Sequence, residues 1–101
     1  MNLSMLNQAR QLKSKLEETQ KELAKMEVTA EAGKGAVRVT VNGQQDVLAI
    51  SISPEVMDPR NPRALERLVL KAITDAQEKS RKQAARKMKA ITGGLKLPGL
   101  F

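Results

Sequence analysis

Positively charged residues crowd into one short run of this sequence. Six of the eleven residues between positions 79 and 89, KSRKQAARKMK, are Lys or Arg, and none is acidic. With about 100° between successive helical residues, Lys79, Lys82, Arg86 and Lys89 fall within about 80° of one another. We therefore predict a cationic helix face, which would attract phosphates whatever the base sequence and bind them less tightly as salt rises.

The cations of this run are the first candidates for contacts to DNA: Lys79, Arg81, Lys82, Arg86, Lys87 and Lys89. A second set of candidates lies near the N-terminus and comprises Arg10, Lys13 and Lys21. Acidic residues offset this second set, and we expect i,i+4 ion pairs there, such as Glu17 with Lys21. The alternative for the run itself is a solvated helix end whose cations interact with the helix dipole.

The charge of the whole chain is concentrated in the same region. The 101 residues include 18 Lys and Arg against 11 Asp and Glu, a formal net charge of +7. Residues 1–59 contain 7 basic and 8 acidic side chains, whereas residues 60–101 contain 11 basic and 3 acidic ones. Such asymmetry favours a polyanionic partner, more often nucleic acid than an anionic membrane.

Enzymatic functions lack the residues they need. The chain has neither His nor Cys, so a common general base and a thiol nucleophile are both missing. The glycines of AGKG and ITGG match neither a phosphate-binding loop nor a dinucleotide fingerprint. We therefore predict a non-enzymatic protein with no cofactor, no metal site and no small-molecule substrate.

The single aromatic residue, Phe101, narrows the class of nucleic acid. Single-strand binders usually stack bases on aromatic rings, so duplex DNA is the favoured partner. No apolar run approaches the ~20 residues of a membrane span, and the N-terminus lacks the apolar core of a signal peptide. We expect no membrane partner and a cytoplasmic location.

The elements that must position these cations follow from hydrophobic spacing. Alternating apolar residues predict three strands at about 27–32, 36–42 and 45–53, which form an antiparallel meander. Gly33-Lys34-Gly35 supplies the first turn, and Asn42-Gly43 supplies the second through residues that tolerate positive φ. Ser53-Pro54 and Asn61-Pro62 each pair an N-cap residue with Pro in the first helical position.

Two long helices flank the meander in a single α+β domain of residues 1–101. The first, about 3–27, carries an apolar seam at heptad spacing, which is weak at Ala9 and Thr19. The second, about 62–92, ends at Gly93-Gly94, and an apolar tail occupies residues 93–101. The second helix would be about 45 Å long, whereas seven-residue strands span about 23 Å. The helices must project beyond the sheet, and we predict a symmetric dimer that covers the exposed edges and stripes.

The complete pattern resembles the YbaB/EbfC family of bacterial nucleoid-associated proteins. The resemblance rests on the block from Val28 to Gly43, on Ser51-Ile52-Ser53-Pro54, and on the tail from Gly93 to Phe101. It implies a homodimer whose helices project like the arms of a tweezer, and DNA binding on the nucleoid through the terminal helices. Two alternatives share these features: an RNA-binding protein that uses the same basic helix, and a protein-interaction module that uses the apolar stripes.

Overall fold

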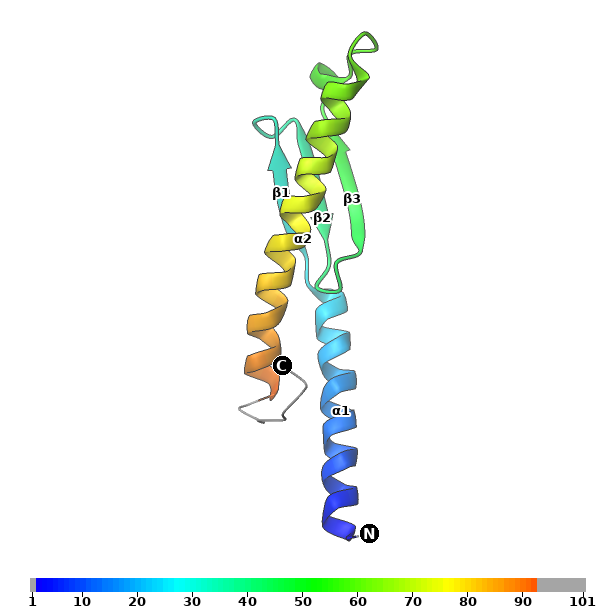
Figure 1. Cartoon of the computed structure of the whole chain (residues 1–101), viewed down its shortest axis with the longest axis vertical. Coiled ribbons are helices and arrows are strands. Elements are labelled where there is room, and N and C mark those ends of the chain that lie inside the picture. Colours follow the sequence, from blue (N-terminus) through cyan, green and yellow to red (C-terminus); the bar gives the residue numbers. More distant parts are fainter. Residues whose placement is uncertain (1, 93–101) are drawn as a thin grey trace.

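The computed structural model describes residues 2–92 and has the predicted α-β-β-β-α order (Figure 1). Its elements are α1 (Leu3–Lys25), β1 (Val28–Ala32), β2 (Val37–Val41), β3 (Val47–Ile52), the 3-10 helix η1 (Pro54–Val56) and α2 (Pro62–Thr92). The predicted fold class is confirmed. The predicted stop at Gly93-Gly94 and the apolar tail lie outside the described residues.

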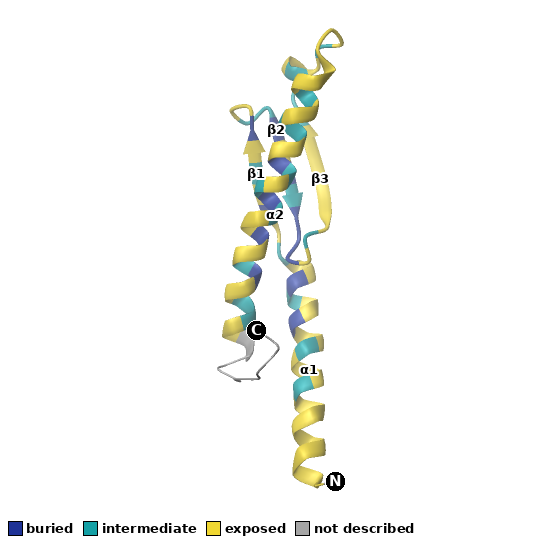
Figure 2. Cartoon of the chain, in the orientation of Figure 1, coloured by how far each residue is buried: buried dark blue, intermediate teal, exposed yellow. Residues whose placement is uncertain are grey.

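The strands form one antiparallel sheet in the order β1-β2-β3, and α2 packs across one face of β1 and β2. Alternation along β2 turns Val37, Val39 and Val41 toward α2, where all three are fully buried. The helix contributes Ala72 and Ala76, also fully buried, and their small side chains let helix and sheet approach closely. The core is therefore a narrow band between α2 and two of the three strands (Figure 2).

The apolar seam predicted for α1 is buried only near the sheet. Thr19 and Leu23 are buried, whereas Met5 is 64% exposed. Thr19, a weak position in the seam, is accommodated because its hydroxyl donates to the Lys15 carbonyl at 2.7 Å. The N-terminal half of α1 extends away from the sheet (Figure 1).

The first predicted turn is confirmed, and the second has a different geometry. Gly33, Lys34 and Gly35 all have positive φ. In the second turn, however, Gln45 has φ 69°, and the expected positive φ at Asn42-Gly43 is wrong. The loop is longer than two residues, because the side-chain oxygen of Asn42 accepts hydrogen bonds from two later backbone N–H groups and holds a wider turn.

Gly43 is needed for close approach to α1. Its N–H donates to the carbonyl of Leu23 at 2.8 Å, one of the last carbonyls of α1, which lack a partner within the helix. A Cβ at position 43 would lie 2.7 Å from that same oxygen and 2.9 Å from the sulfur of Met26. The turn therefore caps α1 and joins it to the sheet.

We expect Gly43→Ala to lower the melting temperature by about 10 °C, since a backbone oxygen cannot yield cheaply to the new methyl group. Thermal unfolding followed by circular dichroism measures this. Gln44→Ala is the matched control, because Gln44 is exposed and loses only exposed hydrogen bonds to Gln20. Equal melting temperatures for the two variants would show that the close contact between Gly43 and the end of α1 does not contribute to stability.

The predicted caps of the two later helices differ in outcome. The side chain of Asn61 accepts from the N–H of Ala64 at 3.4 Å, as expected for the start of α2. Ser53 is the N-cap residue of η1 and Pro54 follows it, as predicted, but the Ser53 side chain forms no capping hydrogen bond. A three-residue helix leaves few N–H groups for a side-chain cap to satisfy, because the N–H of Val56 already donates to the backbone carbonyl of Ser53 at 3.2 Å.

The molecule is a rod of 68 × 19 × 19 Å with a radius of gyration of 19.0 Å. A compact domain of 100 residues would have a radius of gyration of about 13 Å. The 31 residues of α2 extend well beyond strands of five or six residues, so the predicted overhang is confirmed. Within residues 2–92, no helix combines the length and apolarity needed to cross a bilayer.

Candidate nucleic-acid interface

The orientation of α2 is set by three small residues on its C-terminal half. Ala76, Ser80 and Ala84 are buried at spacings of four residues. The Ser80 hydroxyl donates to the Asn42 carbonyl at 2.6 Å, so this hydrogen bond is buried and fixes the helix against the turn that follows β2. The opposite side of the helix must then face solvent.

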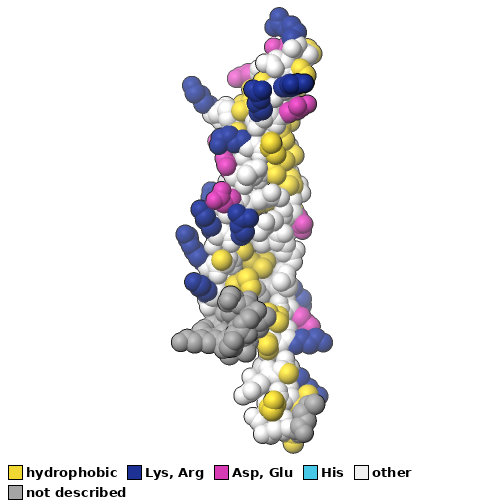
Figure 3. Space-filling view, viewed as in Figure 1, with side chains coloured by type: hydrophobic (Ala, Val, Ile, Leu, Met, Phe, Trp, Pro, Cys, Tyr) yellow, Lys and Arg dark blue, Asp and Glu magenta, His cyan; other side chains and the backbone are white. Residues whose placement is uncertain are grey.

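Four predicted contact residues occupy that solvent side. Lys79, Lys82, Arg86 and Lys89 are all exposed, and we call this set the α2 strip. Figure 3 shows Lys and Arg side chains following one side of the molecule along α2. The geometry therefore brings together the four residues that helical spacing had grouped.

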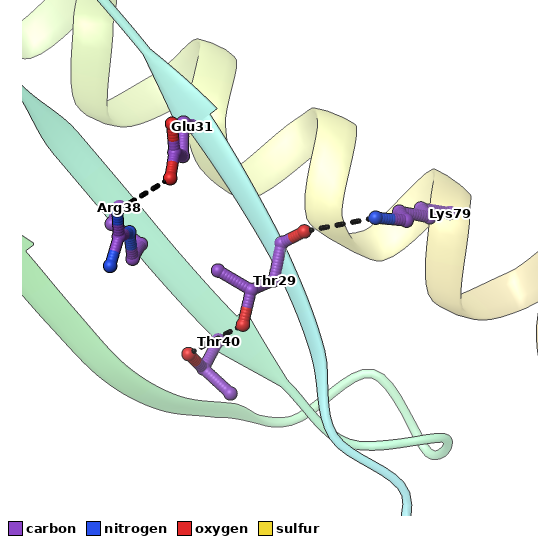
Figure 4. Close-up of polar contacts among 5 residues, drawn as sticks. All are labelled: Thr29, Glu31, Arg38, Thr40 and Lys79. Carbon is purple, nitrogen blue, oxygen red and sulfur yellow. Dashed lines mark hydrogen bonds and ion pairs between the residues drawn. The ribbon is translucent and has the colours of Figure 1, made fainter. Parts of the chain in front are cut away.

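Lys79 and Lys82 of the α2 strip have weak, exposed partners. Lys79 reaches the Thr29 carbonyl at 3.3 Å (Figure 4), and Lys82 pairs with Glu78 at 3.5 Å. Arg86 forms no ion pair with any described residue. Exposed ion pairs contribute only about 0–1 kcal/mol, so a phosphate can replace them at little cost.

Lys87 and Arg81 lie outside the α2 strip. Lys87 is half-buried, and its ammonium group contacts the Glu22 carboxylate of α1 at 3.4 Å. Helical projection already places Lys87 within about 20° of Ser80, on the packed side, and this signal separates it from the strip. Arg81 is exposed but lies about 80° or more around the helix from each strip residue.

The candidates on α1 are exposed but belong to a second surface. Arg10, Lys13 and Lys21 all lie on the exposed part of that helix. The expected Glu17–Lys21 ion pair does not form within residues 2–92. The acidic residue of α1 that forms an ion pair there is Glu22, and its partner is Lys87 of α2. An exposed i,i+4 ion pair stabilises a helix by only about 0.2–0.5 kcal/mol, so separate hydration of the two side chains competes easily with the pair.

The outer face of the sheet offers few free cations. Arg38 contacts Glu31 at 2.7 Å, and the neighbouring Thr29 and Thr40 hydroxyls share a hydrogen bond of 3.1 Å (Figure 4). These cross-strand pairs join β1 to β2, so the guanidinium group of Arg38 already has a partner that stabilises the sheet. Within the described part of the chain, no group of three or more carboxylates is arranged to hold a metal ion.

This fold and this surface define a class of protein: a small sheet that carries a long projecting helix with cations along its solvent side. The chain belongs to the YbaB/EbfC DNA-binding family, whose model matches residues 1–95. The family resemblance drawn from the sequence is thereby confirmed.

Relatives of similar length have names that agree with this membership. A nucleoid-associated protein of Clostridium kluyveri is 41% identical over 98 residues, which cover 97% of this chain and 86% of the relative. Another from Chloroflexus aurantiacus is 42% identical over 97 residues, 96% of this chain and 95% of the relative. The crystal structure of an uncharacterized protein from Helicobacter pylori superposes with a TM-score of 0.70 at 23% identity. The superposition covers 87% of this chain and 97% of the Helicobacter pylori chain, so the two proteins share a fold.

Proposed function

We propose that this chain is a non-enzymatic, nucleoid-associated protein that binds duplex DNA as a homodimer through the α2 strip. The observation that carries the proposal is the strip itself: four cations on one solvent-facing side of a helix whose other side is fixed by buried small residues. Family membership and the names of the relatives support DNA as the polyanion and the nucleoid as its location.

The dimensions of the α2 strip suit a duplex backbone. From Lys79 to Lys89 the strip extends about 15 Å along the helix axis. Duplex DNA carries one negative charge per about 1.7 Å of axis, so about nine phosphates lie within that length. Four cations would therefore meet more phosphates than they can neutralise, and binding would depend little on base sequence.

The proposed dimer is supported by the uncovered strand β3. It lies at the sheet edge, α2 packs chiefly on the other two strands, and Val47, Leu48 and Ile50 are 42%, 50% and 45% exposed. Figure 3 also shows hydrophobic side chains gathered along one side of the upper part of the molecule. A second copy at this edge would bury the apolar side chains and satisfy the free backbone groups.

A gel shift of the purified protein on random-sequence duplex DNA, repeated over a salt series, tests the proposal. We expect affinity to fall with a logarithmic slope of about −0.9 for each phosphate neutralised, which is roughly a 100-fold loss between about 50 and 200 mM salt for four contacts. A flat salt response would contradict phosphate binding by the strip. Competition with duplex RNA of the same sequence is the control, and preferential displacement by RNA would reassign the partner.

A further inference from the structure

An open apolar groove of about 560 Å³ lies along the middle of α1. Ala9, Leu12 and Leu16 supply its apolar surface, and the charged residues Lys13, Glu17 and Lys21 also line it. The described part of α2 contacts α1 near the C-terminal end of α1, where the ammonium group of Lys87 pairs with the carboxylate of Glu22. The groove is therefore a continuation of the α1 seam beyond the reach of the core.

The end of α2 reaches the axial level of this groove along α1. The two helices run in opposite directions (Figure 1), and the Lys87–Glu22 ion pair fixes their relative level. Thr92, the last residue of α2, is five residues beyond Lys87, or about 7.5 Å further along the axis. In antiparallel helices that distance brings the end of α2 level with about Glu17, which lines the groove.

The segment that follows, GGLKLPGLF at residues 93–101, has the composition that such a groove requires. Four of its nine residues are large and apolar, its only charged side chain is Lys96, and it begins with two glycines that allow the chain to change direction. Nine extended residues can reach about 30 Å, whereas the groove from Lys21 to Ala9 is about 18 Å long.

One ion pair is available between the segment and the groove, whose lining also includes Lys13 and Lys21. Glu17 lines the groove, is exposed, and forms no ion pair within residues 2–92. Lys96 is the only cation of the segment, so one ion pair can form there while the leucines cover Leu12 and Leu16. Exposed ion pairs are weak, and the apolar contact would supply most of the affinity.

We propose that residues 93–101 dock in the α1 groove of the same chain and clasp the two helices together beyond the sheet. The clasp covers the apolar part of α1 that the core leaves open. It also fixes the separation between the α2 strip and the α1 cations Arg10 and Lys13. The proposal concerns the free protein, so its test needs no DNA and is independent of the proposed function.

A single tryptophan tests the clasp directly. The chain has no Trp or Tyr, so Phe101→Trp introduces one fluorophore at the end of the segment. We expect its emission to lie at shorter wavelength than that of free tryptophan, and Leu16→Asp in the same background to shift it back. Leu3→Asp is the matched control: Leu3 lies on the same helix, is 75% exposed and does not line the groove. Solvent-like emission in Phe101→Trp, or no response to Leu16→Asp, would overturn the proposal.

A designed disulfide distinguishes docking within a chain from docking between chains. Because the protein contains no cysteine, Ala9→Cys with Leu97→Cys leaves these two thiols as the only ones in each chain. We expect a monomeric, oxidised species on a non-reducing gel, since a disulfide requires Cα atoms within about 7 Å. Ser14→Cys with Leu97→Cys is the control, because Ser14 is exposed on α1 and does not line the groove. A covalent dimer, or equal oxidation of the control, would overturn docking within the chain.

Discussion

Reversal of three charges in the α2 strip, by Lys82→Glu, Arg86→Glu and Lys89→Glu, is expected to weaken duplex binding by about 10²–10³-fold at about 0.1 M salt. Each lost phosphate contact removes about 0.9 from the logarithmic salt slope, and each new glutamate adds repulsion. The affected residues are exposed and contribute nothing to the core. Gel shifts over a salt series measure both the affinity and the slope, and circular dichroism verifies that the helix content is retained.

The matched control for this variant lies at the start of α2 and in the turn just before it. Arg60→Glu, Arg63→Glu and Arg67→Glu change the formal net charge by the same amount and are also confined to exposed residues. If the strip is the interface, the control should retain most of the affinity. An equal loss in both variants would mean that binding responds to the overall charge of the protein, and the assigned helix face would be wrong.

Local rules were sufficient to predict the elements of this fold. Valine alternation at positions 37, 39 and 41 predicts a strand with one buried side, and all three side chains are fully buried. Asn61-Pro62 predicts the start of α2, where Asn61 caps the helix. Such signals lie within a few residues of the feature that they specify, so a sequence reveals them without knowledge of the tertiary structure.

The features that sequence reasoning missed depend on contacts between distant residues. Asn42-Gly43 indicated a tight hairpin turn, yet Gly43 is needed because the Leu23 carbonyl approaches its backbone from α1. Lys87 was grouped with the cationic run, but Glu22, on another helix, pairs with it. No local pattern predicts either partner.

The candidate interface shows the same division. Helical spacing alone groups Lys79, Lys82, Arg86 and Lys89, because a regular helix fixes which residues share a side. Spacing could not predict that Lys79 reaches the Thr29 carbonyl, since that contact depends on how β1 lies beside α2. Likewise, the seam on α1 predicts an apolar side of the helix, but it does not say what covers Ala9, Leu12 and Leu16.

Ile50→Asp is expected to separate the proposed dimer into monomers. Ile50 lies on the edge strand β3 and is 45% exposed in a single chain, so a carboxylate there remains hydrated in the monomer. In a dimer that covers β3, the same carboxylate would lose water without gaining a partner, which costs several kcal/mol. Light scattering should then give the 11.1 kDa mass of one chain, whereas the parent protein should give about twice that mass.

Ser51→Asp is the matched control, because neighbouring strand residues point to opposite sides of the sheet. Ser51 is exposed and lies opposite Arg38 in the β2–β3 register, so a carboxylate there has a cation nearby. A parent protein that is already monomeric would remove the case for the dimer, and an Ile50→Asp variant that stays dimeric would remove β3 from the interface.

The Ile50→Asp variant also tests how the two protomers use their α2 strips. If both strips contact one duplex, the monomer should show about half the salt slope of the dimer, since it neutralises half as many phosphates.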